Sequence, residues 1–229
     1  MRCRVVVYNL KGFRLGREPI AEVLHDLAPD VLLVQESGPR RYLRRLGERL
    51  GMEVASDPWS PLRRRVKNAV LVRTPLTIAG HRLDRFPGTE RFYPRGALLA
   101  DVRAWSVRLR VVSAHLGLVP AERAAHAEML ADLALPLDPP TILGADLNER
   151  PGRGAAARLA EALRDVRPQD PLPADTKHDQ GATFPSDDPS ARIDYLLVSE
   201  GVGVASARVA VEAGIASDHL PLVADLEIG

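Results

Sequence analysis

An apolar run leads directly into two polar side chains in the stretch Pro140-Thr141-Ile142-Leu143-Gly144-Ala145-Asp146-Leu147-Asn148. The first four residues predict a short buried strand. If the strand geometry continues through Asn148, the side chains of Asp146 and Asn148 share one face, because residues two apart in a strand point the same way. A carboxylate beside a carboxamide suits holding a hydrated cation, positioning a water molecule or donating to a phosphate oxygen. The alternative is a turn in which these side chains bond to nearby backbone.

The size and composition predict one globular domain, residues 1–229. No stretch is long and apolar enough to span a bilayer, and residues 1–8 are expected to form the first strand rather than a signal peptide. Cys3 is the only cysteine, so an internal disulfide is excluded. This favours a reducing, cytoplasmic location, with Cys3 as a small core residue. The net charge of +1 carries no global nucleic-acid signature.

The opening of the chain alternates strand, helix and strand. Residues 4–8 form a β-branched run, residues 19–27 carry an apolar stripe at helical spacing, and residues 31–36 read as a buried strand. This order indicates a layered α/β fold. Further helices are expected at 40–50, 120–135 and 155–163, and further strands at 69–72, 76–81, 97–102, 107–114, 193–198, 204–211 and 220–228. The close spacing of the strands between 69 and 114 predicts antiparallel neighbours.

Polar residues stand where most of these strands meet their loops. They are Asn9, Glu36, His115, Asp146, Asn148, Asp194, Asp218 and His219. Each has a separate structural explanation: Asn9 as a turn cap, His115 as a buried and satisfied histidine, or Asp194 as half of a surface ion pair with Arg192. A shared pole explains all of them at once, and we expect these side chains to converge.

Such a set of side chains suits phosphoryl transfer. Acids and amides without cysteine favour a hard cation such as Mg²⁺ or Mn²⁺. The histidines can carry a proton near neutral pH. Phosphoryl transfer needs neutralisation of the phosphate oxygens, an oriented water and help for the leaving oxygen, and the set offers a candidate for each task.

Six motifs in order resemble those of the endonuclease/exonuclease/phosphatase (DNase I-like) superfamily. They are Tyr8-Asn9-Leu10, Val34-Gln35-Glu36, Ser113-Ala114-His115-Leu116, Gly144-Ala145-Asp146-Leu147-Asn148, Arg192-Ile193-Asp194-Tyr195 and Ser217-Asp218-His219. The resemblance runs from the first strand to the last. It implies a four-layer α/β/β/α sandwich of two mixed β-sheets flanked by helices, with a metal-dependent phosphoesterase site at one end.

The resemblance also implies roles for the strand-end residues. Glu36 would ligate the divalent metal, with Asn9 and Asp218 nearby. By the same resemblance, the catalytic residues would be Asp146, which would orient or deprotonate the attacking water, and Asn148, which would donate to the scissile phosphate. His219, held by Asp194, would contact the phosphate or act as base, and His115 would stabilise or protonate the opposite side. Family members differ over which group is the base, so the roles of Asp146 and His219 stay open.

The chain departs from two well-defined branches of this superfamily. Abasic endonucleases usually carry Tyr at the position of His115, and secreted DNase I relatives carry disulfides that Cys3 cannot supply. The chain looks like the broad bacterial branch of metal-dependent hydrolases, in which Arg95 also faces the substrate. Arg95 could instead pair with a surface acid.

The first hypothesis for the substrate is a nucleic acid, DNA or RNA, cleaved by a nuclease acting as a monomer. Arg40 follows Glu36 closely, and residues 63–65 are all arginine just before Asn68. We expect Arg40, Asn68 and Arg95 to contact substrate, because arginines there could track a phosphate backbone. The alternative is a solvated charged face, and the aromatic content of 4% gives little for base stacking.

Two other hypotheses stay open. A phosphodiesterase or phosphatase for a lipid headgroup or small phosphoester, as in sphingomyelinases, needs an apolar loop beside the site. The candidates for that loop are Trp59, Leu62, Phe86, Phe92 and Tyr93. A non-catalytic phosphate-binding module would lack metal or water-handling residues, and none is missing.

Overall fold

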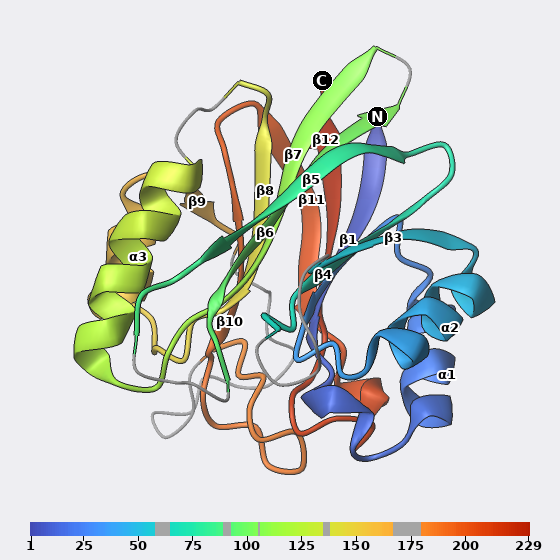
Figure 1. The fold of residues 1–229 in the computed structure, drawn as a ribbon, viewed down its shortest axis with the longest axis horizontal. Helices are drawn as coiled ribbons and strands as arrows, with labels where there is room; N and C mark the ends of the chain where they lie inside the picture. Colours follow the sequence, from blue (N-terminus) through green and yellow to red (C-terminus); the bar gives the residue numbers. More distant parts are fainter. Residues whose placement is uncertain (58–64, 89–92, 105, 135–137, 167–179) are drawn as a thin grey trace.

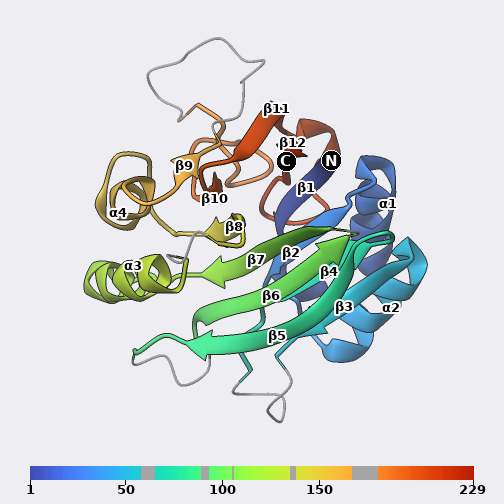
Figure 2. The same cartoon turned by 90° about the horizontal axis from the view of Figure 1, so that it is seen from above.

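The computed structural model describes residues 1–57, 65–88, 93–104, 106–134, 138–166 and 180–229. Two six-stranded mixed sheets lie face to face, and helices cover the outer face of each (Figures 1 and 2). The predicted four-layer α/β sandwich is therefore confirmed.

The first sheet has the strand order β11-β12-β1-β2-β4-β3. Its strands are β1 (Arg2–Asn9), β2 (Val31–Gln35), β3 (Met52–Ser56), β4 (Ala69–Arg73), β11 (Val202–Val209) and β12 (Leu222–Ile228). Helices α1 (Arg17–Leu27) and α2 (Arg40–Leu50) pack on its outer face. Short 3₁₀ turns, η1 (Lys11–Phe13) and η2 (Val211–Ala213), follow β1 and β11.

The second sheet has the order β5-β6-β7-β8-β10-β9. Its strands are β5 (Thr77–Arg85), β6 (Gly96–Ala104), β7 (Val107–His115), β8 (Thr141–Asp146), β9 (Arg164–Asp165) and β10 (Asp194–Val198). Helices α3 (Pro120–Ala134) and α4 (Gly154–Ala160) cover its outer face. Among the described residues, no helix combines the length and apolarity needed to cross a membrane.

The central strands are apolar on both faces because each lies between a helix layer and the opposite sheet. In β1, Val5 and Val7 belong to the core between the sheets, while Val6 and Tyr8 belong to the core under α1 and α2. Both faces are thus withdrawn from water, which explains the unbroken apolar runs of β1, β2 and β8. Cys3 is 2% exposed within the core between the sheets, so its prediction as a core residue is confirmed.

The sheets approach each other closely at Gly144. A Cβ atom there would lie 2.6 Å from both Leu33 Cδ1 and Val7 Cγ2, so a glycine is needed in β8 at this level. Next to it, Gln35 Nε2 donates to Ser113 Oγ at 3.2 Å and to the Gly144 carbonyl at 3.3 Å. Ser113 Oγ in turn donates to the Val34 carbonyl at 2.7 Å. These buried bonds fix the two sheets relative to one another just below the strand ends.

The strands differ from the sequence expectation in two ways. Two edge strands are not predicted: β3, because Met52–Ser56 is short and has a mixed polar pattern, and β9, because it spans only two residues. The strands β4 and β5 follow each other closely in sequence, but they belong to different sheets. The chain crosses between the sheets after Arg73, which a spacing argument cannot show. The neighbours β5–β6 and β6–β7 are antiparallel, as expected.

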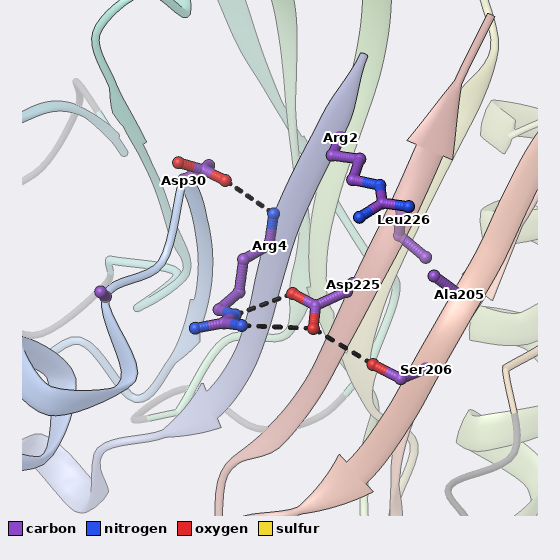
Figure 3. A pocket seen from close by; sticks show the side chains of 8 residues that line it. Arg2, Arg4, Asp30, Ala205, Ser206, Asp225 and Leu226 are labelled. Atoms are coloured by element: carbon purple, nitrogen blue, oxygen red, sulfur yellow. Dashed lines mark hydrogen bonds and ion pairs between the residues drawn. The ribbon is translucent and has the colours of Figure 1, made fainter.

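A hollow at the other end of β1 from Asn9 is held by paired charges (Figure 3). Arg4 donates to the Asp225 carboxylate at 2.8 and 3.2 Å, and its backbone N–H donates to Asp30 Oδ2 at 2.7 Å. The hydrogen bond with Arg4 lowers the pKa of Asp225, and the same bond raises the pKa of Arg4. Arg2 pairs with Glu227. These contacts clamp β1 to β12 and to the loop before β2.

Candidate active site

The strand registers bring the polar strand ends to one pole. In the second sheet, His115 at the end of β7 pairs with Asp146 at the end of β8, and Asp194 at the start of β10 pairs with Asp146 from the other side. In the first sheet, Asn9 is in register with Gln35, the residue before Glu36. His219 lies in the segment that leads into β12, which is antiparallel to β1. The side chains expected to converge therefore sit at one end of both sheets.

Asp146 is the centre of the hydrogen-bond network at this pole. It is 1% exposed. Its Oδ2 accepts a 3.0 Å bond from Asn9 Nδ2 and lies 3.2 Å from His115 Nε2. Its Oδ1 accepts a 3.0 Å bond from the backbone N–H of Asn148. A buried carboxylate is costly unless it is hydrogen bonded, and these donors offset that cost while fixing its orientation.

Asn148 reaches the site by a turn and not by continuation of the strand. Strand β8 ends at Asp146, and Asn148 has a left-handed φ of 50°. Its Nδ2 lies 3.1 Å from His115 Nε2 and donates to the Leu116 carbonyl at 3.0 Å. The strand expectation is thus wrong. The turn alternative describes the backbone, yet the turn still brings the Asn148 amide beside Asp146 and His115.

Asp194 and His219 form a buried pair. His219 Nδ1 lies 2.8 Å from Asp194 Oδ2, and the same oxygen accepts a 2.6 Å bond from Thr183 Oγ1. The ring of Phe184 packs against the His219 ring, with 4.9 Å between their centroids. The other imidazole nitrogen, Nε2, lies 3.9 Å from Asp146 Oδ2. The pair thus faces the Asp146 network.

The surface ion pair considered for Asp194 is not formed. Arg192 instead pairs with Asp165, at 2.5 Å between Nη2 and Oδ1. No role for Thr183 or Phe184 is predicted from the sequence. Their contacts depend on a loop that returns to the site, and the only local signal is a hydroxyl next to an aromatic residue shortly before the Asp194 motif.

The pKa values of the two histidines are shifted in opposite directions. Burial lowers the pKa of His115 to about 3, and the opposing effect of Asp146 is offset by Arg95 and His219. Burial also opposes the charged form of His219, but Asp194, Asp146 and Asp218 outweigh it and raise the pKa of His219 to about 10. These shifts favour the neutral form of His115 and the protonated form of His219 on either side of Asp146. Separation of pKa values in neighbouring groups is typical of acid–base sites.

The oxygen donors at this pole suit a hard divalent cation. Ligand atoms of Asp146, Asp194 and His219 lie within 4.8 Å of one another, and Asp194 Oδ1 is buried without a hydrogen-bond partner among the described residues. Glu36, which has a φ of 47°, lines a hollow beside His115. Carboxylate and amide oxygens are the ligands that Mg²⁺ and Mn²⁺ prefer.

The metal ligands expected from the sequence differ in how far they are already engaged. Asn9 Oδ1 accepts the Lys11 backbone N–H at 3.0 Å, and Asp218 Oδ2 is paired with Lys11 Nζ at 2.9 Å. Within the described part of the chain, no hydrogen bond or ion pair engages the Glu36 carboxylate. Of the three expected ligands, Glu36 is therefore the one with both carboxylate oxygens unengaged among the described residues. Lys11 had no predicted role; it lies two residues beyond Asn9 in the turn after β1.

The three predicted substrate contacts lie in different settings. The Arg95 guanidinium approaches the His115 ring, with Nη1 2.6 Å from Nε2 and 2.7 Å from Nδ1. Asn68 is buried, and its Nδ2 donates to the carbonyls of Gly96 and Ser113 at 2.7 and 3.0 Å. Arg40 is exposed at the start of α2 and donates to the Asp57 carbonyl. Asn68 thus bridges the sheets, and of the three residues Arg95 is the one that contacts His115.

The fold matches solved structures of low sequence identity. A Bacteroides vulgatus endonuclease/exonuclease/phosphatase protein aligns with a TM-score of 0.80 at 15% identity, over 100% of both chains. A Bacteroides thetaiotaomicron mannosyl-6-phosphatase aligns at 0.76 and 18% identity, over 99% of this chain and 100% of that one. D. rerio TDP2 in complex with a single-strand DNA product aligns at 0.75 and 17% identity, over 99% of both chains.

A family model adds sequence evidence to this likeness of fold. No curated protein sequence matches the chain significantly. The model described as the Endonuclease/Exonuclease/phosphatase family, however, matches residues 6–219. That range begins within β1 and ends at His219, so it contains every strand-end residue of the pole. The chain that carries this two-sheet fold and this pole belongs to the endonuclease/exonuclease/phosphatase family.

Proposed function

We propose that the protein is a divalent-metal-dependent phosphodiesterase, with DNA or RNA as its favoured substrate class. The observation that carries the proposal is the arrangement around Asp146. This buried carboxylate is oriented by Asn9 and Asn148 and lies between His115, whose Nε2 is 3.2 Å away, and His219, whose Nε2 is 3.9 Å away. The family membership supports hydrolysis of a phosphoester. The likeness to D. rerio TDP2 bound to a single-strand DNA product supports the choice of nucleic acid.

Each group has a proposed task in hydrolysis. Asp146 orients the attacking water and takes its proton as the new P–O bond forms and the ester P–O bond breaks. His219, kept protonated by Asp194, donates a hydrogen bond to a non-bridging phosphate oxygen, where negative charge builds up. Asn148 supplies a neutral donor to the same phosphate. His115 lies on the other side of Asp146, towards the leaving oxygen, which takes its proton from solvent.

A divalent cation, when bound, neutralises charge on the phosphate and lowers the pKa of a ligating water. We propose Glu36 as its main ligand, with Asn9 and Asp218 nearby. The Asp146, Asp194 and His219 group is the alternative, but the 2.8 Å bond between Asp194 Oδ2 and His219 Nδ1 already occupies one ligand atom of each. Glu36→Gln should therefore shift the metal titration midpoint more than His219→Ala does. Equal midpoints in both variants and the wild type would remove Glu36 as ligand.

A second candidate function is hydrolysis of a small or lipid-linked phosphoester. One observation favours it: a hollow beside Asp218 and Phe184 is bordered by Leu15 and Ile215, which are 48% and 71% exposed. The likeness to a mannosyl-6-phosphatase makes a sugar phosphate a further candidate substrate. Of the apolar residues expected near the site, Trp59, Leu62 and Phe92 lie outside the described residues, and Phe86 is buried against His126. Tyr93 is 53% exposed.

Substrate profiling separates these functions. The purified protein is incubated with Mg²⁺ or Mn²⁺ and plasmid DNA, single-stranded DNA, RNA, sphingomyelin, mannose 6-phosphate or bis-p-nitrophenyl phosphate. We expect nucleic acid cleavage that is lost in EDTA and in Asp146→Asn, while Asp101→Asn, at an exposed position of β6, keeps it. Headgroup or sugar-phosphate release without nicking would replace the nuclease by the second candidate. Tight binding of an ester without turnover would support a binding module instead.

A further inference from the structure

A cationic hollow opens directly beside the proposed catalytic cluster of His115, Asp146 and His219. Its charged lining residues are Arg65, Lys67, Arg95 and Glu36, and His115 is shared with the cluster. Three cations thus face a single acid. If Glu36 holds a divalent metal, the positive excess is larger still. Such a concentration of positive charge next to a phosphate-cleaving centre favours a second anionic group of the substrate.

The three cations differ in what they already bind. Arg65 is 6% exposed and donates to the Gly38 carbonyl, so its guanidinium is built into the wall. Arg95 lies against His115. The Lys67 ammonium makes no hydrogen bond or ion pair to the described residues, and it sits 5.2 Å from the centre of the Tyr93 ring. The ring holds the ammonium at the rim by a cation–π contact without using up its N–H donors.

A second hollow at the same pole has the opposite charge balance. It is lined by Lys11, Asp187 and Asp218 among others, and Lys11 is paired with Asp218 at 2.9 Å. Its acids outnumber its cations, and its rim carries the exposed side chains of Leu15 and Ile215. Because the two hollows differ in charge balance, they predict how the substrate is oriented across the site. Any further negatively charged group of the substrate would lie in the hollow of Lys67.

We propose that the hollow of Arg65, Lys67 and Arg95 binds a second phosphate of the substrate, next in line to the scissile phosphate, with the Lys67 ammonium as its main ligand. This inference rests on the proposed phosphodiesterase function. The second phosphate can come from a neighbouring nucleotide or from a pyrophosphate linkage, and both present the same anion. The enzyme would then select bisphosphorylated substrates over isolated esters.

The test compares matched chromogenic substrates with one leaving group. They are p-nitrophenyl thymidine 5′-phosphate, the same compound with a 3′-phosphate, and the p-nitrophenyl ester of thymidine 5′-diphosphate. In the wild type we expect the added phosphate to raise kcat/KM about tenfold. The 3′-phosphate arm reports a neighbouring nucleotide, and the diphosphate arm reports a pyrophosphate linkage. The gain should shrink with rising salt, because partly exposed charges are screened.

The variants assign the gain to Lys67. In Lys67→Met the ratio of kcat/KM with and without the added phosphate should fall towards one, and Tyr93→Ala should lower it while Tyr93→Phe keeps it. Arg108→Met, at an exposed position of β7, is the matched control and should leave the ratio unchanged. Binding of the 3′-phosphorylated product in EDTA, measured by calorimetry, should weaken in Lys67→Met as well.

Hydrolysis of all three esters with equal kcat/KM would overturn the second-phosphate site while leaving the phosphodiesterase intact. Hydrolysis of none of them, nor of nucleic acid, would overturn the proposed function itself.

Discussion

The side-chain amide of Asn9 donates a 3.0 Å hydrogen bond to Oδ2 of Asp146, across 137 residues of chain and between the two sheets. Asn9 ends β1 of the first sheet, and Asp146 ends β8 of the second. The bond is buried, so neither partner has water as an alternative. The bond holds the Asp146 carboxylate, which we place at the centre of the proposed chemistry, against the end of β1.

Replacing Asn9 should therefore reduce stability and activity together. Asn9→Ala leaves a buried carboxylate oxygen with one donor fewer, which costs about 1–3 kcal/mol in the free energy of unfolding. Urea denaturation measures that loss, and hydrolysis should drop by about 10²-fold. Ser206→Ala, which removes a 3.1 Å bond to Asp225 at the exposed far end, is the matched control. Unchanged hydrolysis in Asn9→Ala would show that this bond does not orient Asp146.

His126 should act as a positioning residue for two site loops. It is 1% exposed; its Nδ1 accepts the Gly117 N–H at 3.2 Å, and its Nε2 lies 2.5 Å from the Pro87 carbonyl. Gly117 follows His115 by two residues, and Phe86, stacked on His126, donates through its N–H to the Arg95 carbonyl. Because a Gln side chain offers one acceptor and one donor, His126→Gln should keep kcat within a few fold.

His126→Leu removes both contacts and should lower kcat about tenfold or more, with a loss of about 1–3 kcal/mol in unfolding free energy. Steady-state kinetics and urea denaturation measure the two effects. The comparison fails if Leu and Gln variants lose kcat equally, because packing alone would then explain the role of the ring.

A side chain at position 144 should destabilise the folded protein. In Gly144→Ala the new Cβ would meet Leu33 and Val7 at 2.6 Å between the sheets. Overpacking of this kind costs about 1–3 kcal/mol, measurable as a lower midpoint of urea unfolding. Gly80→Ala in β5 is the control, since a Cβ there meets nothing within 4 Å. Equal midpoints for the two variants would contradict the close approach of the sheets at Gly144.

Cys3 should resist thiol reagents in the folded protein. Burial, with Asp30 and Asp225 nearby, raises the pKa of its thiol to about 12. At pH 8 the thiolate fraction is then about 10⁻⁴, and the thiolate is the reactive form. Ellman's reagent should label Cys3 fully in urea and only very slowly without it. Rapid labelling of the native protein would mean that the start of β1 opens readily.

The sequence was informative wherever a residue's role follows from its own segment. The unbroken apolar runs of β1, β2 and β8 predict strands that are buried on both faces, and both faces of these strands are covered. The apolar stripe of α2 predicts a helix whose bounds, Arg40–Leu50, are those found. The convergence of Asn9, Asp146 and His219 was predicted from their shared position at strand ends. The strand registers bring this convergence about.

The features that sequence could not supply are those set by distant parts of the chain. The left-handed turn at Asn148 is stabilised by contacts with His115 and Leu116. The Thr183 hydroxyl reaches Asp194 only because its loop folds back. Asn68 seemed a substrate ligand by its place in the chain, but its amide donates to two carbonyls of the other sheet. Each of these depends on contacts that only the folded chain brings together.

The most direct test of the account is the rate of Mg²⁺- or Mn²⁺-dependent hydrolysis of bis-p-nitrophenyl phosphate and of single-stranded DNA by the wild type and by Asp146→Asn. We predict clear turnover by the wild type and a loss of about 10³-fold or more in the variant, while its circular dichroism spectrum stays that of the folded protein. Undiminished hydrolysis by a folded Asp146→Asn variant would contradict the assignment of this pole as the catalytic centre.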